Sequence, residues 1–107
     1  MATSFNSAST KTKIVRQQVY ECPPSIQAVV FSATLANIDN SLMQEHWVSL
    51  EIQRTDLSYE LLLNKVPVPY GNTLVVPKFS LAAGEKFFIS SDADDVIQGR
   101  FSIVEKS

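Results

Sequence analysis

Residues 27–36 read QAVVFSATLA, and this stretch decides the fold class. In an extended chain its apolar side chains fall on both faces: Val29, Phe31 and Leu35 on one, and Ala28 and Val30, with Ile26 just before them, on the other. A strand that is apolar on both faces is buried on both, so the pattern predicts a central strand. A single open sheet would leave one of these faces in water, so we expect two packed sheets.

Six more segments are typical of strands, and turn residues separate them about every ten residues. They are residues 12–21, 45–53, 59–66, 73–76, 86–90 and 97–104. Prolines and glycines punctuate the intervals, as in Cys22-Pro23-Pro24 and Tyr70-Gly71-Asn72. We expect Pro67 and Pro69 to end the strand before them. The sequence therefore predicts an all-β protein, an antiparallel β-sandwich of about seven strands. It is jelly-roll or immunoglobulin-like, with a small barrel as the alternative.

Period-two alternation also predicts which side chains face the core. In residues 45–53, the apolar face carries His46, Val48, Leu50 and Ile52, which places Trp47 on the outer face. In the last strand, Ile97, Gly99, Phe101 and Ile103 share the inner face. We expect one large apolar residue from each main strand to be buried: Phe31, Leu50, Leu61, Phe87 and Phe101.

The start of the chain differs from the rest. Residues 1–12 are small, polar and without period, which predicts a flexible or extended N-terminal arm ahead of a single domain at residues 13–107. The first sixteen residues carry +3, from Lys11, Lys13 and Arg16, and contain no acid. Since the whole chain carries −2, the remaining 91 residues carry −5.

A basic arm on an acidic body has two interpretations: charges that keep a tail solvated, or an arm that docks on the acidic surface of a neighbouring copy. The candidate acidic surface is the loop with Asp92, Asp94 and Asp95. This loop lacks the glycine and the terminal glutamate of a calcium loop, so no metal is predicted there.

Composition excludes most enzyme chemistry. His46 is the only histidine and Cys22 the only cysteine, which leaves no multi-ligand zinc site and no internal disulfide. We expect His46 to be hydrogen-bonded at the edge of the core, or else to titrate at an interface, and Cys22 to be a partly buried free thiol. Three glycines cannot build a phosphate-binding loop. No catalytic residue, cofactor or metal is therefore predicted.

The same composition bears on partners and location. The net charge of −2 argues against a dedicated nucleic-acid binder. No apolar run is long enough to span a membrane, and the N-terminus has no apolar signal segment. We expect a chain made in the cytoplasm.

Two aromatic residues are the strongest candidates for a contact surface. Trp47 is predicted on an outer sheet face, and Tyr70 lies in a turn. A large exposed aromatic residue is an efficient anchor for another subunit. The alternative for Trp47 is cover by the arm or by a loop of the same chain.

Residues 66–105 resemble a group of small virion structural proteins of tailed bacteriophages. The resemblance lies in Val-Pro-Val-Pro-Tyr-Gly-Asn-Thr-Leu-Val-Val at 66–76, Leu-Ala-Ala-Gly-Glu at 81–85 and Ser-Ile-Val-Glu at 102–105. Upstream, Tyr20-Glu21-Cys22-Pro23-Pro24 and residues 30–37 fit the same group. This sequence departs from the group at Tyr70, where a small residue is usual, and at Cys22, where an aliphatic one is.

The resemblance implies a non-enzymatic β-sandwich of the virion that forms a homo-oligomer and binds other virion proteins. Within that class we expect a capsid decoration (cement) protein that contacts the major capsid protein, with a neck or tail accessory protein as the alternative. A different class is also open, a carbohydrate- or ligand-binding module. Its exposed aromatic candidates are Trp47, Tyr59 and Tyr70, which lie on separate segments.

Overall fold

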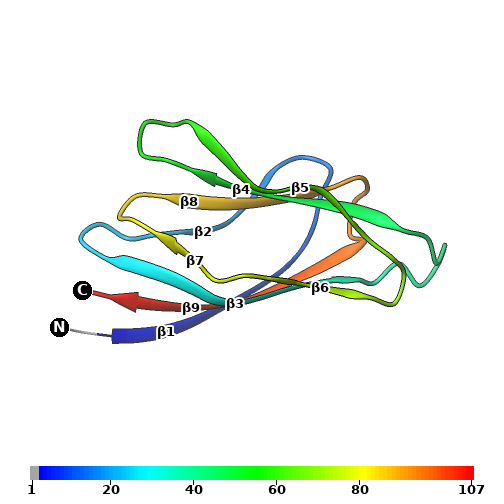
Figure 1. The fold of residues 1–107 in the computed structure, drawn as a ribbon, viewed down its shortest axis with the longest axis horizontal. Helices are drawn as coiled ribbons and strands as arrows, with labels where there is room; N and C mark the ends of the chain where they lie inside the picture. Colours follow the sequence, from blue (N-terminus) through cyan, green and yellow to red (C-terminus); the bar gives the residue numbers. More distant parts are fainter. Residues whose placement is uncertain (1–2) are drawn as a thin grey trace.

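A computed structural model describes residues 3–107, and its ribbon shows two antiparallel sheets packed face to face (Figure 1). The five-stranded sheet runs β1-β9-β3-β6, with β7 also paired to β3, and the four-stranded sheet runs β2-β8-β4-β5. The strands are β1 (Thr3–Lys11), β2 (Gln17–Glu21), β3 (Gln27–Asn37), β4 (His46–Gln53), β5 (Tyr59–Val68), β6 (Thr73–Val76), β7 (Phe79–Leu81), β8 (Lys86–Ser91) and β9 (Ile97–Lys106). The expected β-sandwich is confirmed.

The strand order is that of a jelly roll. The chain passes from one sheet to the other after β1, β2, β3, β5, β7 and β8, and β4 and β5 form a hairpin within the four-stranded sheet. Strands β6 and β7 both pair with β3 and together act as one interrupted edge strand. When they are counted as one, the described strands fill the eight strand positions of a jelly roll, which consists of two Greek keys. The last strand, β9, lies between β1 and β3 in the middle of its sheet.

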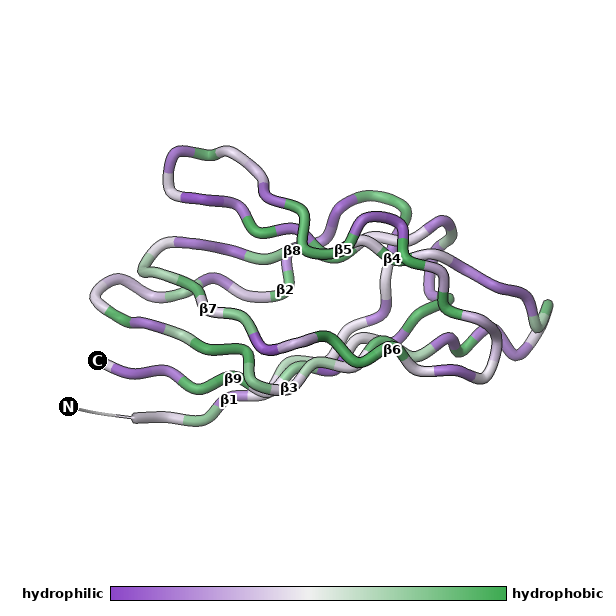
Figure 2. The backbone as a smooth tube through the Cα atoms, viewed as in Figure 1, coloured by the Kyte–Doolittle hydropathy of each residue, from purple (hydrophilic) through white to green (hydrophobic). Residues whose placement is uncertain are grey.

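The core fills the space between the sheets, and apolar residues recur along strands of both sheets (Figure 2). Phe87 of β8 and Phe101 of β9 meet edge to face across this space, with ring centroids 5.0 Å apart. Phe79 of β7 packs against Phe87 in the same manner at 5.4 Å. Leu50 is also fully buried. The expectations for Leu50, Phe87 and Phe101, and for the inner faces of β4 and β9, are confirmed.

Two residues expected in the core, Phe31 and Leu61, are exposed. Phe31 lies at the bulge of β3 against β9, between Val30 and Ser32, and is 47% exposed. The extra residue reverses the parity of the strand, so Ala28 and Val30 point inward before it and Ala33 and Leu35 after it. Leu61 is 52% exposed, because the regular register that runs from the β4–β5 turn, Gln53↔Tyr59 and Ile52↔Glu60, pairs it with outward-facing Glu51.

The structure has nine strands in the part of the chain that it describes, where the sequence predicted seven. The first addition is β1: residues 3–11 of the expected arm are extended, and they pair with β9 along their whole length. Met1 and Ala2, the start of that expected arm, lie outside the described residues. The second addition is the short strand β7. The strand expected from residue 12 begins only at Gln17.

The expectation that Pro67 ends the sheet is wrong, because Pro67 lies within β5, opposite Trp47. Since β5 is an edge strand, the missing N–H of proline leaves no ladder bond unmade. No segment within residues 3–107 forms a helix that could cross a membrane.

Candidate functional site

The outer face of the four-stranded sheet carries two of the residues predicted to form an interface, Arg16 and Trp47. Arg16 lies across this face from the β1–β2 loop: its Nε and Nη2 donate to the two carboxylate oxygens of Glu51 at 3.0 and 2.9 Å. Its guanidinium carbon stands 3.7 Å from the ring centroid of Tyr59, which meets Phe88 edge to face. The described structure therefore holds Arg16 on its own chain, where a bidentate pair and a cation–π contact fix its position.

Trp47 is half-buried at the start of β4 on the same sheet, between the buried His46 and Val48. The bulge of β5 against β4 places Lys65 in a left-handed conformation with φ of 51°, and its N–H donates to Ser49 Oγ at 3.0 Å. The ammonium of Lys65 then lies 5.3 Å from the ring centroid of Trp47. Part of the indole is thus covered by its own chain, and its role between chains stays a prediction.

The basic residues near the arm and the acidic loop meet within one chain. Lys13 Nζ donates to Asp95 Oδ1 at 2.8 Å, and the N–H of Ile14 donates to Asp94 Oδ1 at 2.9 Å. The hydrogen bond from Lys13 lowers the pKa of the Asp95 carboxyl, and the charge of Lys11 acts in the same direction. These contacts fasten the β1–β2 loop to the β8–β9 loop. Pairing of either segment with a neighbouring copy stays a prediction.

His46 joins two loops from inside the sandwich. Its Nε2 lies 2.7 Å from Asp39 Oδ2 in the β3–β4 loop, and its Nδ1 lies 2.9 Å from Asp92 Oδ1 in the β8–β9 loop. Burial opposes the imidazolium charge, but the two carboxylate hydrogen bonds outweigh it and raise the pKa of His46. The hydrogen bond with His46 lowers the pKa of Asp39. The expectation of a hydrogen-bonded histidine at the core edge is confirmed.

Asp39 lies in residues 37–41, Asn-Ile-Asp-Asn-Ser, a run of turn-forming residue types, and it was not predicted as a functional residue. Its spacing of seven residues from His46 across a loop has no helical or strand period, so no pattern pointed to the contact. Asp92, predicted as an interface residue, is a partner of the buried histidine within this chain, and its contact with another chain stays a prediction.

Tyr70 lies in the β5–β6 connection, and its hydroxyl donates to Asn40 Oδ1 at 3.2 Å. Asn40 belongs to the β3–β4 loop, which also carries the exposed side chains of Leu42 and Met43. These two connections thus meet at one end of the molecule, and they present an exposed apolar tip there. Trp47 and Tyr70 do not share one surface element.

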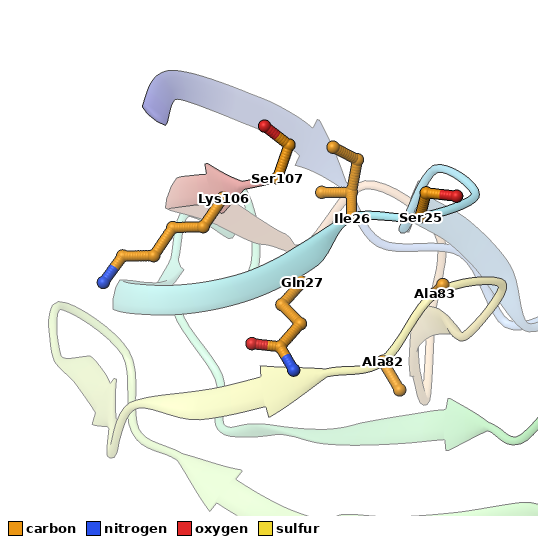
Figure 3. Close-up of a pocket in the computed structure, with 7 residues that line it drawn as sticks. All are labelled: Ser25, Ile26, Gln27, Ala82, Ala83, Lys106 and Ser107. Atoms are coloured by element: carbon orange, nitrogen blue, oxygen red, sulfur yellow. The ribbon is translucent and has the colours of Figure 1, made fainter. Parts of the chain in front are cut away.

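A shallow pocket of about 500 Å³ opens at the other end, where β3 begins and β9 ends (Figure 3). Gln27, Ala82 and Lys106 are among the residues that line it, and the Lys106 ammonium points away from the hollow. The described lining holds no carboxylate side chain, imidazole or thiol. Within residues 3–107, no group of three or more His, Cys, Asp or Glu side chains could hold a metal ion. Cys22 is a fully buried free thiol.

No family model and no curated protein matches this sequence. Solved structures match its fold. A chain in the acid-stable capsid of Helicobacter pylori bacteriophage KHP30 is similar at a TM-score of 0.57 and 10% identity, covering 98% of this chain and 87% of that one. A chain of the Bacillus endospore appendages, a family of disulfide-linked pili, has a TM-score of 0.57 and 11% identity, covering 97% of this chain and 84% of that one. At such identities the likeness shows a shared fold.

Proposed function

We propose that this chain is a non-enzymatic structural subunit of a tailed-phage particle, and specifically a capsid decoration protein that forms a homo-oligomer and binds the major capsid protein. The observation that carries the proposal is the jelly roll itself, which matches a chain of a phage capsid over 98% of its length. The resemblance of residues 66–105 to small virion proteins points to the same class.

The distribution of polar groups supports a scaffold rather than a catalyst. The buried or half-buried ionic side chains described above are each neutralised by partners from a neighbouring loop or strand: His46 by two carboxylates, and Glu51 by Arg16. Such pairs fix loops and faces in place. A rigid sandwich with fixed outer faces is what repeated contacts in a particle require.

The neighbour among endospore appendages also belongs to an assembly of many subunits. Those pili are described as disulfide-linked, whereas the single cysteine of this sequence is fully buried. A contact between copies of this chain would therefore be non-covalent.

The carbohydrate-binding alternative finds less support. Tyr59 pairs with Gln53, six positions from Trp47 along the β4 strand, which corresponds to about 20 Å. Tyr59 also lies under Arg16. The exposed aromatic rings do not form one platform on which a sugar could stack.

The test is the copy number of this chain in purified particles, measured by quantitative mass spectrometry against the major capsid protein. A decoration protein is expected at hundreds of copies per particle. A count of about six or twelve would favour the neck or tail, where ring symmetry limits the number. Absence of the chain from purified particles would contradict the proposal as a whole.

A further inference from the structure

The free edge of β1 is unusually regular. Its nine residues pair with β9 from Thr3↔Lys106 to Lys11↔Gln98 with no shift of register. On its other side β1 is the end of the sheet, so alternate N–H and C=O groups face outward without a strand partner in the described chain. Phe5 on this strand is 73% exposed.

The other edges of the sandwich carry the features that block pairing. Strand β2 has five residues and a register shift. Strand β5 has two register shifts and contains Pro67. The edge formed by β6 and β7 consists of four and three residues, with Pro77 between them. By contrast β1 has no proline and no bulge, and its only charge is Lys11 at the end. In natural proteins such short strands, bulges and prolines keep an edge strand from pairing with another chain, and β1 lacks them.

We propose that β1 pairs antiparallel with β1 of a second copy of this chain, around a two-fold axis that joins the two five-stranded sheets into one. A comparison of the edge strands indicates which partner β1 would bind. A straight nine-residue edge needs a partner of equal length and regularity, and among the described strands only β1 is such an edge. An isologous contact of this kind closes on itself.

The side chains suit this pairing. Directly opposed residues must share a face, so the two-fold axis passes midway between the two copies of one residue, and full overlap of the nine positions makes that residue Ser7. Ser7 then faces its own copy, Ser4 faces Thr10 of the second copy, and Phe5 faces its Ser9. Lys11 faces uncharged Thr3, so no like charges are opposed. The second copy's Lys11 stands diagonal to Phe5, where its stem covers part of the exposed ring.

The contact is expected to be weak alone. Its strip is about 30 Å long and one strand deep, which is less than the roughly 800 Å² per partner of a standard stable interface. We expect a reversible dimer with a dissociation constant in the micromolar to millimolar range. The inference goes beyond the proposed function, since it names the surface and holds whatever particle or filament the chain joins.

The test uses charge exchange at the axis. Ser7 is exposed, so S7K and S7E are compatible with the fold, and each places two like charges face to face in the dimer. Sedimentation equilibrium of the full chain should show a dimer whose dissociation constant rises tenfold or more in S7K alone and in S7E alone. An equimolar mixture of S7K and S7E should restore association. V75K and V75E are the matched controls, because Val75 is 71% exposed on the opposite edge of the same sheet.

A second experiment, disulfide cross-linking, tests the distance between the two copies of residue 7. Since Cys22 is buried, S7C introduces the only exposed thiol, and oxidation should link S7C into a covalent dimer faster than V75C. A chain that stays monomeric up to about 1 mM would overturn the proposal. So would a dimer that S7K and S7E leave intact, because its interface would lie elsewhere.

Discussion

Replacement of Phe101 by alanine tests the core, and Phe31→Ala is its matched control. Phe101 is fully buried in β9 and meets Phe87 of the opposite sheet at 5.0 Å. Its removal loses about 2–3 kcal/mol of transfer free energy. The edge-to-face contact and the cavity that remains add to this, for a total of about 3–5 kcal/mol. Phe31 is half exposed on the outer face and leaves no cavity, so Phe31→Ala should cost about 1 kcal/mol or less.

The measurement is equilibrium unfolding in urea by far-ultraviolet circular dichroism, with the unfolding slope fitted for each variant. At high protein concentration a dimer would add to apparent stability, so the comparison is made at low micromolar concentration. A loss in Phe101→Ala below about 1 kcal/mol would refute the face assignment of β9. Equal losses in the two variants would refute the bulge as the reason that Phe31 is exposed.

Three further substitutions give distinct results. His46→Gln should lower stability by about 2 kcal/mol or more. Because the pKa of His46 is raised on folding, its contribution is fully present below the unfolded pKa of about 6.5 and is lost as pH rises through the folded pKa. The difference in stability between wild type and His46→Gln, measured by thermal melts, should therefore be large near about pH 5.5 and small at alkaline pH. A difference that grows as the pH rises would contradict the ion pairing. Gly99→Ala should cost about 1–3 kcal/mol in urea titrations, because the new methyl group would stand 2.9 Å from the Phe101 ring; an unchanged midpoint would show that the ring moves freely. Trp47→Ala should change monomer stability by at most about 1 kcal/mol yet weaken particle binding by about 2 kcal/mol or more, as measured by co-sedimentation. Tryptophan emission that is already blue and unquenchable in the monomer would place the indole in the core instead.

The inner faces of β4 and β9 could be predicted from the sequence because their inward side chains recur at every second position, although Ser49 of β4 is buried as well. The outward orientation of Phe31 could not be predicted from the sequence. A bulge depends on how β3 fits β9, its partner at the far end of the chain, and nothing in residues 27–36 marks the extra residue. The face of Leu61 could not be predicted for a different reason: residues 61–63 are three consecutive leucines, and only the pairing with outward-facing Glu51 shows which way Leu61 points.

Strand β1 was missed on different grounds. Its serines, threonines and alanines show no apolar alternation because even its inner face contacts the core only slightly, with Ala8 and Thr10 half-buried. The partner that makes it a strand is β9, about ninety residues away in the register. For the candidate site, composition identified the charged residues, but only the fold shows that Lys13, Asp94 and Asp95 meet within one chain.

The position of β9 has a consequence for the way the protein is made. This strand is the last of the nine to leave the ribosome, yet it occupies the middle of its sheet and contacts both β1 and β3. Until it is synthesised, β1 has no hydrogen-bonding neighbour and β3 lacks one flank. The nascent chain therefore carries an unpaired, aggregation-prone strand until β9 has been synthesised, and closure of the sheet must wait for that strand.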